Sequence, residues 1–343
     1  MTVTFKRATL ADVANLAGVS LGSASRALSV PEEVKPKTLE KVNQAVAQLG
    51  YVRNGAAQAL ASKKTKTIAV IYPSLDNPIF ASSVNSLQMS LWQRGYQLLI
   101  ASHNYDWDRE AIVAQSMVEK GIDGLILVGT EHHPSVYEVL RRRQIPYVLT
   151  WSKDLTDYPY CVGFSNETAA YNLAKLVLSK GHRKIAICSG DFLHNERAKA
   201  RVQGTLRACT EFGVDVPKEY IIEQALSVNG GREGLKKIWT LAQKPSVIIF
   251  GNDAQAIGAI DESHRLGIRI PEDLSVTGFD DIELASLVYP PLTTIRVPIN
   301  EIGTLAAQMM IDLIQHPSNA HDKNKNYSLT AEVIERQSLG DAK

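Results

Sequence analysis

The strongest constraint on how this chain can fold is a regular alternation of short apolar runs with helical stretches. From residue 67 onward, the strand-like runs TIAVIYP, YQLLIAS, DGLILVG and PYVLTW are separated by stretches with helical spacing. A second series begins near residue 166 and contains KIAICSG, SVIIFGND and LSVTGFDD. Such alternation predicts βαβ units on parallel sheets. We therefore expect two doubly wound halves, with a ligand cleft between the carboxyl ends of their strands.

The first 50 residues follow a different pattern, in which every predicted element is a helix. Thr9, with an acidic residue three positions later, is a capping-box start for a first helix, and Gly18 permits the left-handed turn that ends it. Ser20 can N-cap a second helix directly afterwards. A third helix is predicted from Pro36 to Gly50. Two helices joined by a tight turn form either a DNA-binding helix-turn-helix or an ordinary helical hairpin.

The distribution of charge favours the DNA-binding interpretation. Residues 1–66 carry ten Lys or Arg against four acids, whereas the remainder carries 27 bases against 32 acids. A basic head on a mildly acidic body predicts a polyanionic partner for the head alone.

Several other classes of protein are not favoured by the composition. No apolar run approaches the ~20 residues that span a bilayer, and no secretory signal follows the first basic residues, so we expect a cytoplasmic protein without a membrane partner. Three cysteines without CxxC spacing fit reduced thiols. The eight histidines are scattered and predict no metal site. Asp280 and Asp281 are adjacent carboxylates without a nucleophile, and the glycine-rich SVNGGREG lacks a strand–GxGxxG–helix context, so neither an enzyme nor a cofactor is expected.

Eight motifs in register make the chain resemble the LacI/GalR (lactose-repressor) family of bacterial transcription regulators. They are TLADVANLAGVSLGSASRAL, LGYVRNGAAQALAS, PSLDNPIF, DGLIL, GHRKIA, FGNDAQAIGA, IPEDLSVTGFDD and PPLTTI. The resemblance covers nearly the whole chain. It implies an α/β protein with a three-helix helix-turn-helix head and a core, like that of periplasmic binding proteins, of two doubly wound parallel-sheet subdomains.

The resemblance also implies the division of the chain. We expect a DNA-binding domain at 1–50, a hinge helix or linker at 51–66 and an effector-binding core at 67–343. Within this core we expect an N-subdomain at about 67–164 and 297–326, and a C-subdomain at about 165–296 and 327–338.

In the head, the resemblance implies that the start of the second helix faces the edges of DNA bases. The expected DNA-contacting residues there are Thr9, Ser20, Leu21, Gly22, Ser23, Ser25 and Arg26. Arg26 can fork onto a guanine or hold a phosphate, and serine hydroxyls suit phosphate. Ser20 can also simply cap the helix, and both roles are compatible. Gly22 offers no side-chain donor, so little direct sequence readout is expected at this edge.

The hinge is the second expected DNA contact. By resemblance, paired hinge helices lever a leucine into the minor groove, and Leu60 occupies that position, with Asn54 and Ala57 at matching helix positions. An apolar wedge unstacks a base step and kinks the duplex. Arg53 stands where proline is frequent in the family, and Gly55 costs ~1 kcal/mol of helix propensity relative to alanine. We therefore expect this hinge to depend on DNA for its order.

In the core, the resemblance implies ligand contacts at the ends of strands. Arg201 can fork onto hydroxyls or a carboxylate, Asn252 offers a donor and an acceptor, and Asp280 can accept from two sugar hydroxyls. Each has a local alternative, a surface charge for Arg201 and a helix cap for the other two. Trp151 fits a platform for a sugar ring and a core residue equally well, and Phe164 fits the core near the hinge better than a ligand contact. The expected effector-binding set is Asn77, Phe80, Trp151, Phe164, Arg201, Asn252 and Asp280.

Together these features predict a homodimeric repressor of a pseudo-palindromic operator in double-stranded DNA, because one head covers one half-site. A sugar, sugar acid or related metabolite would change the angle between the core halves and weaken operator binding. A corepressor with the opposite effect is an open alternative. The sequence shows no leucine heptad near its C-terminal end, so we do not expect a tetramer built on such a heptad. The competing classes are a solute-binding protein of a sugar transporter, which the basic head and missing signal peptide oppose, and a two-domain enzyme, which would need a catalytic constellation.

Overall fold

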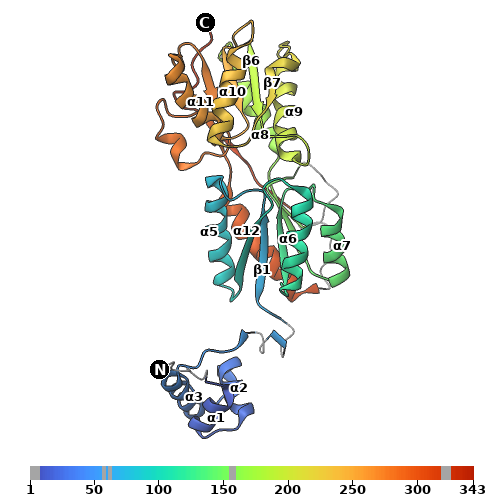
Figure 1. Cartoon of the computed structure of the whole chain (residues 1–343), viewed down its shortest axis with the longest axis vertical. Coiled ribbons are helices and arrows are strands. Elements are labelled where there is room, and N and C mark those ends of the chain that lie inside the picture. The colour runs from blue at the N-terminus through green and yellow to red at the C-terminus, as the bar shows by residue number, and fades with distance from the viewer. Residues whose placement is uncertain (1–7, 56–58, 61–63, 154–159, 318–325) are drawn as a thin grey trace, which may run out of the picture. The chain divides into compact units, whose positions relative to one another are not determined.

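The computed structural model describes residues 8–55, 59–60, 64–153, 160–317 and 326–343 (Figure 1). The chain divides into two compact units, Met1–Thr65 and Lys66–Lys343, which we call the head and the core. The expected α/β class is confirmed, since the head is helical and the core is built on parallel sheets. Within the residues the structure describes, no helix has the length and apolarity needed to cross a membrane.

Local capping chemistry sets the helix ends of the head. Its elements are α1 (Leu10–Ala17), α2 (Leu21–Ser29), the 3-10 turn η1 (Pro31–Glu33) and α3 (Pro36–Leu49). The capping box is complete, because the Thr9 hydroxyl accepts from the Asp12 amide while the Asp12 carboxylate accepts from the Thr9 amide at 2.8 Å. Gly18 ends α1 at a φ of 65°, and the Ser20 hydroxyl accepts from the Ser23 amide at the start of α2.

Small apolar side chains form the core of the head. Alanine dominates it, which lets the three helices pack at short range, and larger aliphatic side chains surround it. The buried residues are Val13, Ala14, Ala17, Ala24, Ala27, Val42 and Ala45. On α3, Leu39, Val46 and Leu49 lie on one face of the helix and pack against this cluster.

The N-subdomain of the core is a six-stranded parallel sheet with helices on both faces. The strand order is β11-β5-β4-β3-β1-β2. The strands are β1 (Thr67–Tyr72), β2 (Gln97–Ser102), β3 (Gly124–Val128), β4 (Tyr147–Thr150), β5 (Cys161–Gly163) and β11 (Tyr327–Ser328). The helices are α5 (Pro78–Trp92), α6 (Trp107–Glu119), α7 (Pro134–Arg143) and α12 (Ile299–Gln315).

Alternation along β1 serves both faces of this sheet. Ile68, Val70 and Tyr72 join the hydrophobic cluster that includes α5 and α12, whereas Ala69 and Ile71 join the cluster that includes α6 and α7. In Figure 1, α5 lies to one side of β1, and α6 and α7 lie to the other. A strand buried on both faces explains why TIAVIYP is a continuous apolar run.

The C-subdomain repeats this design with four parallel strands in the order β7-β6-β8-β9. The strands are β6 (Ile185–Ser189), β7 (Ile221–Glu223), β8 (Val247–Phe250) and β9 (Ser275–Thr277). The helices are α8 (Asn166–Ser179), α9 (Glu196–Glu211), α10 (Val228–Trp239) and α11 (Asp253–Leu266), with 3-10 turns η2 (Lys218–Tyr220) and η3 (Glu283–Ser286). Figure 1 shows α10 and α11 to one side of β6 and α9 to the other.

The glycine-rich stretch SVNGGREG has a packing role. It begins α10, where a Cβ on Gly231 would lie 1.8 Å from the Gln255 carbonyl oxygen. In return, a Cβ on Gly258 of α11 would lie 1.9 Å from the Val228 carbonyl oxygen. The two helices therefore touch through backbone, which only glycine permits at these positions.

The chain crosses between the subdomains three times. The crossings run from β5 to α8, from β10 (Thr294–Arg296) to α12, and from β11 to β12 (Glu332–Ile334), and β10 pairs with β12 in an antiparallel ribbon. Two expected boundaries need correction. Tyr327 and Ser328 pair with β5, so the N-subdomain extends past residue 326. The C-subdomain continues beyond residue 338, because the Ala342 amide donates to the Lys180 carbonyl at 2.8 Å.

Candidate functional sites in the head and the core

The expected DNA-contacting side chains of the head lie in the first two turns of α2 and at its N-cap, except for Thr9, which caps α1. Leu21 is 54% exposed, Ser23 is partly buried, and Thr9, Ser20, Gly22, Ser25 and Arg26 are exposed. Capping already engages some of them, since the Ser20 and Ser23 hydroxyls lie 2.8 Å apart. The apolar edge at Leu21 and the exposed charge of Arg26 together form a surface that suits the floor and rim of a DNA groove.

Arg53, which departs from the family pattern, fastens the beginning of the hinge to α2. Its guanidinium donates to the Leu28 carbonyl at 2.6 Å and to the Ser29 hydroxyl at 2.8 Å. The Ser29 hydroxyl in turn donates to the Ser25 carbonyl at 2.7 Å. The carbonyls in the last turn of a helix have no partner within the helix, so Arg53 supplies one from outside.

We predict that the two hydrogen bonds from Arg53 to Leu28 and Ser29, rather than the charge of Arg53, support DNA binding. Arg53→Ala and Arg53→Lys should both weaken specific binding by about fivefold, because alanine has no donor and lysine lacks the rigid planar guanidinium that meets both acceptors. The slope of log affinity against log salt should stay the same in a binding titration. If Arg53→Lys binds DNA as tightly as the wild type does, and the magnitude of the salt slope falls by about one only in Arg53→Ala, Arg53 is instead a phosphate contact.

The described part of the hinge leaves its central leucine open to solvent. Leu60 lies in a short helical stretch and is 85% exposed, and Asn54 is exposed as well. Ala57, the third expected hinge contact, lies outside the described residues. Leu60 is therefore accessible to a partner, as a contact with DNA requires.

Six of the expected core side chains line one pocket between the subdomains. The N-subdomain supplies Asn77, Phe80 and Trp151, and the C-subdomain supplies Arg201, Asn252 and Asp280. Asn77 follows β1, Trp151 follows β4, Asn252 follows β8 and Asp280 follows β9. The pocket therefore lies where the carboxyl ends of both sheets meet, as the alternating pattern of the sequence predicts.

Arg201 is held rigidly in the pocket wall. Its Nε donates to Asn166 Oδ1 at 2.9 Å and its Nη1 donates to the Gly251 carbonyl at 2.7 Å. The guanidinium also lies over the Phe279 ring, 3.6 Å from its centroid. Asp280 is the neighbouring charge, with Oδ1 at 4.0 Å from Arg201 Nη1.

Asp280 also joins the two subdomains. Its Oδ2 accepts a hydrogen bond from Asn77 Nδ2 at 3.3 Å. Burial raises the pKa of Asp280 to about 7, and nearby Asp253 adds to this, whereas Arg201 and Asn77 oppose it. Burial likewise raises the pKa of Asp253 to about 6. Asp280 can therefore act as an acceptor or, when protonated, as a donor near neutral pH.

Asn252 combines the two roles that the sequence left open. Its Oδ1 accepts from the Gln255 amide at 2.9 Å and caps α11, while its Nδ2 donates to the Leu226 carbonyl at 3.3 Å. The same residue lines the pocket. The cap fixes the orientation of the side chain, which a binding site needs.

The aromatic residues divide between the pocket and the core. Phe80 and Trp151 meet edge to face at 5.2 Å and form an apolar wall. Trp151 is buried and also lines the pocket, so it packs in the core, and its role as a platform for a sugar ring stays a prediction. Phe164 is fully buried and stacks on Phe279 at 6.2 Å. This packing agrees with the core interpretation of Phe164, and a contact between its ring and a ligand stays a prediction.

Several lining residues were not expected from the sequence. They are Ile79, Tyr105, Asn195, Arg197, Ala198, Leu226 and Gly251. One signal was available, because Arg197 precedes Arg201 by four residues and shares its face of α9. Tyr105 and Asn195 lie in loops, and only the approach of the two subdomains brings them together.

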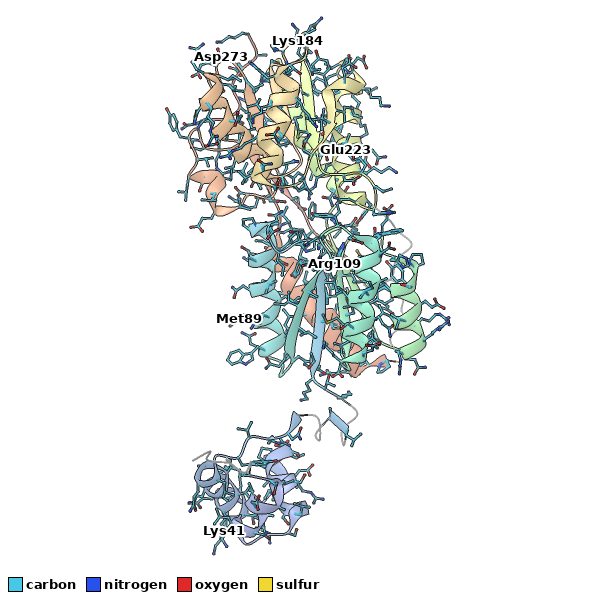
Figure 2. All side chains as sticks on the ribbon, viewed as in Figure 1. Lys41, Met89, Arg109, Lys184, Glu223 and Asp273 are labelled. Carbon is cyan, nitrogen blue, oxygen red and sulfur yellow. The ribbon has the colours of Figure 1, made fainter. Side chains whose placement is uncertain are left out.

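The pocket is narrow and opens into a larger chamber. Its cavity of about 30 Å³ holds no more than one or two water molecules. The outer chamber has about 720 Å³ and shares Asn77, Tyr105, Asn195 and Leu226 with it. Glu223, labelled in Figure 2, lines this chamber together with Lys237. In the described part of the chain, no cluster of three or more His, Cys, Asp or Glu could hold a metal ion.

Comparisons with known proteins agree with this arrangement. The family described as bacterial regulatory proteins, lacI family, matches residues 9–54, and the periplasmic binding protein-like domain matches residues 174–339. The chain is 32% identical to catabolite control protein A of Priestia megaterium, over 88% of this chain and 91% of that protein. It is 31% identical to the ribose operon repressor of Escherichia coli K12, over 96% and 99% of the two chains. The names of both relatives are those of regulators, not of enzymes.

A solved structure extends the similarity to the whole fold. The lac repressor dimer, bound to operator and the anti-inducer ONPF, matches with a TM-score of 0.85 at 26% identity, covering 98% of this chain and 100% of that one. The same family is indicated by the helix-turn-helix, by the two-subdomain core and by the relatives that match along nearly the whole length of the chain. The chain therefore belongs to the lacI family of bacterial regulatory proteins.

Proposed function

We propose that this protein is a transcriptional repressor that binds a specific operator and releases it in response to a small-molecule effector. The observation that carries the proposal is the pocket itself, in which side chains from both subdomains converge at the carboxyl ends of the two sheets. A ligand in this pocket contacts both subdomains and therefore favours one relative arrangement over others. The exposed edge of α2 on the same chain supplies the DNA-binding function.

The effector proposed for this pocket is a small polyhydroxylated molecule, either a sugar or a sugar acid. Asp280 and Asn252 suit hydroxyl groups, and the wall of Phe80 and Trp151 suits the C–H face of a ring. Arg201 can fork onto vicinal hydroxyls or a carboxylate. Because the cavity is only about 30 Å³, a sugar needs the subdomains to move apart or must extend into the outer chamber.

A homodimer is part of the proposal. Two apolar surfaces of the core are exposed: Met89 and Trp92 on α5 beside Ile100 on the edge strand β2, and Leu284, Leu287 and Tyr289 in and after η3. Trp92 is 62% exposed and Tyr289 is 80% exposed, which is unusual for such large side chains. A second copy that covers them would bring two heads to a pseudo-palindromic operator, as in the operator-bound lac repressor dimer.

A DNA-binding titration at several salt concentrations tests the proposal. With a duplex selected from a random pool, affinity should fall by about 10³-fold or more between 50 and 200 mM salt, because basic groups of two heads neutralise phosphates. A sugar that raises the melting temperature of the protein should then weaken binding to the selected duplex. A solute-binding protein would bind the sugar but no DNA, and failure to bind any duplex at low salt rejects the repressor.

A further inference from the structure

Two residues at the start of α9 reach across the interface between the subdomains. Glu196 Oε1 accepts a hydrogen bond from the Thr130 amide at 2.8 Å, and Arg197 Nη1 donates to the Val128 carbonyl at 3.0 Å. Glu196 and Arg197 also pair with one another at 3.1 Å. Both residues are buried, with side chains no more than 10% exposed, so these contacts form in a poorly solvated space where a lost partner is costly.

The backbone that receives them leaves no room for a side chain. A Cβ on Gly129 would lie 1.9 Å from Arg197 Nη1, and Gly129 adopts a φ of 103°. Glycine at this position therefore lets the Arg197 guanidinium approach the carboxyl end of β3 directly.

The receiving loop after β3 is itself fixed by a buried carboxylate. Glu110 on α6 accepts from His132 Nδ1 at 2.6 Å and from the His133 amide at 3.0 Å. Burial alone would raise the pKa of Glu110, but these two hydrogen bonds, together with the charges of His132 and His103, outweigh burial and lower it. The Tyr137 hydroxyl also donates to the Thr130 carbonyl at 2.9 Å. The loop therefore presents the Thr130 amide from a rigid support.

A second contact closes the same side of the interface. Trp107, at the start of α6, stacks on His194, which immediately precedes the N-cap of α9, with ring centroids 3.5 Å apart and planes 18° apart. This ring pair joins the starts of α6 and α9, whereas the Glu196–Thr130 hydrogen bond joins the start of α9 to the loop after β3. They lie beside the pocket, since Arg197 lines it, whereas Glu196 is outside the set of lining side chains identified among the described residues.

We propose that Glu196 is a positioning residue that clamps the two subdomains together and so sets how much of the protein is in the closed, ligand-gripping arrangement. The Glu196 carboxylate makes two interactions at once. It accepts a hydrogen bond from the Thr130 amide, and its ion pair with Arg197 holds that guanidinium near the Val128 carbonyl. Loss of the clamp leaves a buried amide and a buried guanidinium short of a partner, which shifts the equilibrium toward an open arrangement. The effect on DNA binding rests on the proposed function, but the closure itself is a property of the core.

Distance measurement between spin labels tests the clamp without effector or DNA. Cys161, Cys188 and Cys209 are buried, so labels can be directed to cysteines introduced at the exposed positions Lys120 and Thr210, one in each subdomain. Glu196→Ala should shift the ratio of closed to open distances by about tenfold toward open. Glu196→Gln, which keeps an acceptor for the Thr130 amide, should shift it less and serves if the alanine variant folds poorly.

The matched control removes a carboxylate on α8 that pairs with an arginine of α9, the helix that also carries Glu196. Glu167 pairs with Arg207 of α9 within the C-subdomain, so Glu167→Ala should leave the distances unchanged. Wild-type distances in both Glu196 variants overturn the clamp. Because no DNA is present, a protein that failed as a repressor would still give a clear result on closure.

Binding data then separate a clamp from a direct ligand contact. Once a stabilising sugar is found, Glu196→Ala should weaken its binding by about tenfold and should shift operator affinity in the direction opposite to the effect of that sugar, as linkage requires. Weakened sugar binding with unchanged label distances would show that Glu196 touches the ligand, and would overturn the proposal.

Discussion

Arg201→Ala is expected to weaken effector binding by at least about 100-fold, while the effector-free protein still binds its operator. Alanine removes a guanidinium that is already held by Asn166 and the Gly251 carbonyl, so the wild-type pocket spends little conformational entropy in orienting it. Loss of two charge-assisted hydrogen bonds to a ligand costs about 3 kcal/mol or more. Calorimetry or a thermal-shift titration with the identified sugar measures the loss.

Two further variants interpret that result. Arg201→Lys keeps the charge without the fork, so we expect it to recover only a small part of the affinity. Arg207→Ala, two turns further along α9 in an exposed pair with Glu167, should bind effector normally. If Arg201→Ala binds the sugar as tightly as the wild type does, the effector does not use this pocket.

Leu60→Ala is expected to weaken specific operator binding by about 100-fold and to change non-specific DNA binding little. Leu60 is 85% exposed, so its truncation removes nothing from the core of the free protein. Burying a leucine side chain stabilises a complex by about 1.5 kcal/mol or more, and a dimer brings two of them. The loss falls on the specific complex because only a kinked duplex accepts an apolar wedge.

Val52→Ala is the matched control for this prediction. Val52 is an equally exposed aliphatic residue, at 84%, in the same segment of the chain. We expect it to bind operator within about threefold of the wild type, because surface apolar residues away from a contact contribute little. A circularisation assay on the selected duplex should show less bending with Leu60→Ala alone. Equal losses in both variants, or an equal loss on random DNA, would contradict the wedge.

Local chemistry was sufficient to predict the ends of the helices and the long strands. Thr9 and Ser20 cap their helices through hydrogen bonds to residues three positions away, so a short window of sequence contains both partners. The run TIAVIYP is long enough to show that it is buried on both faces. By contrast, β5, β7 and β12 have three residues each and β11 has two, which is too short for any periodicity to appear.

The site was predicted in part, for a different reason. Arg201 and Asp280, which the family resemblance selected, line one pocket, whereas the buried Phe164 stacks on Phe279 outside the set of lining residues, because resemblance gives a position and not the direction in which a side chain points. The contact between Glu196 and Thr130 joins residues 66 positions apart. Such a contact exists only after two sheets have folded and met, and no local pattern encodes it.

The head and the core are joined by one chain connection and the two core subdomains by three, and this difference decides which parts could be exchanged with those of a relative. The head joins the core through the single segment at 51–66, whereas neither core subdomain is continuous, because the chain passes between them three times. A chimera built by one cut in that segment would transfer operator choice as a unit. Exchange of one core subdomain would require three simultaneous splices, one between β5 and α8 and two beside the β10–β12 ribbon, so effector choice should be transferred only with residues 66–343 as one block.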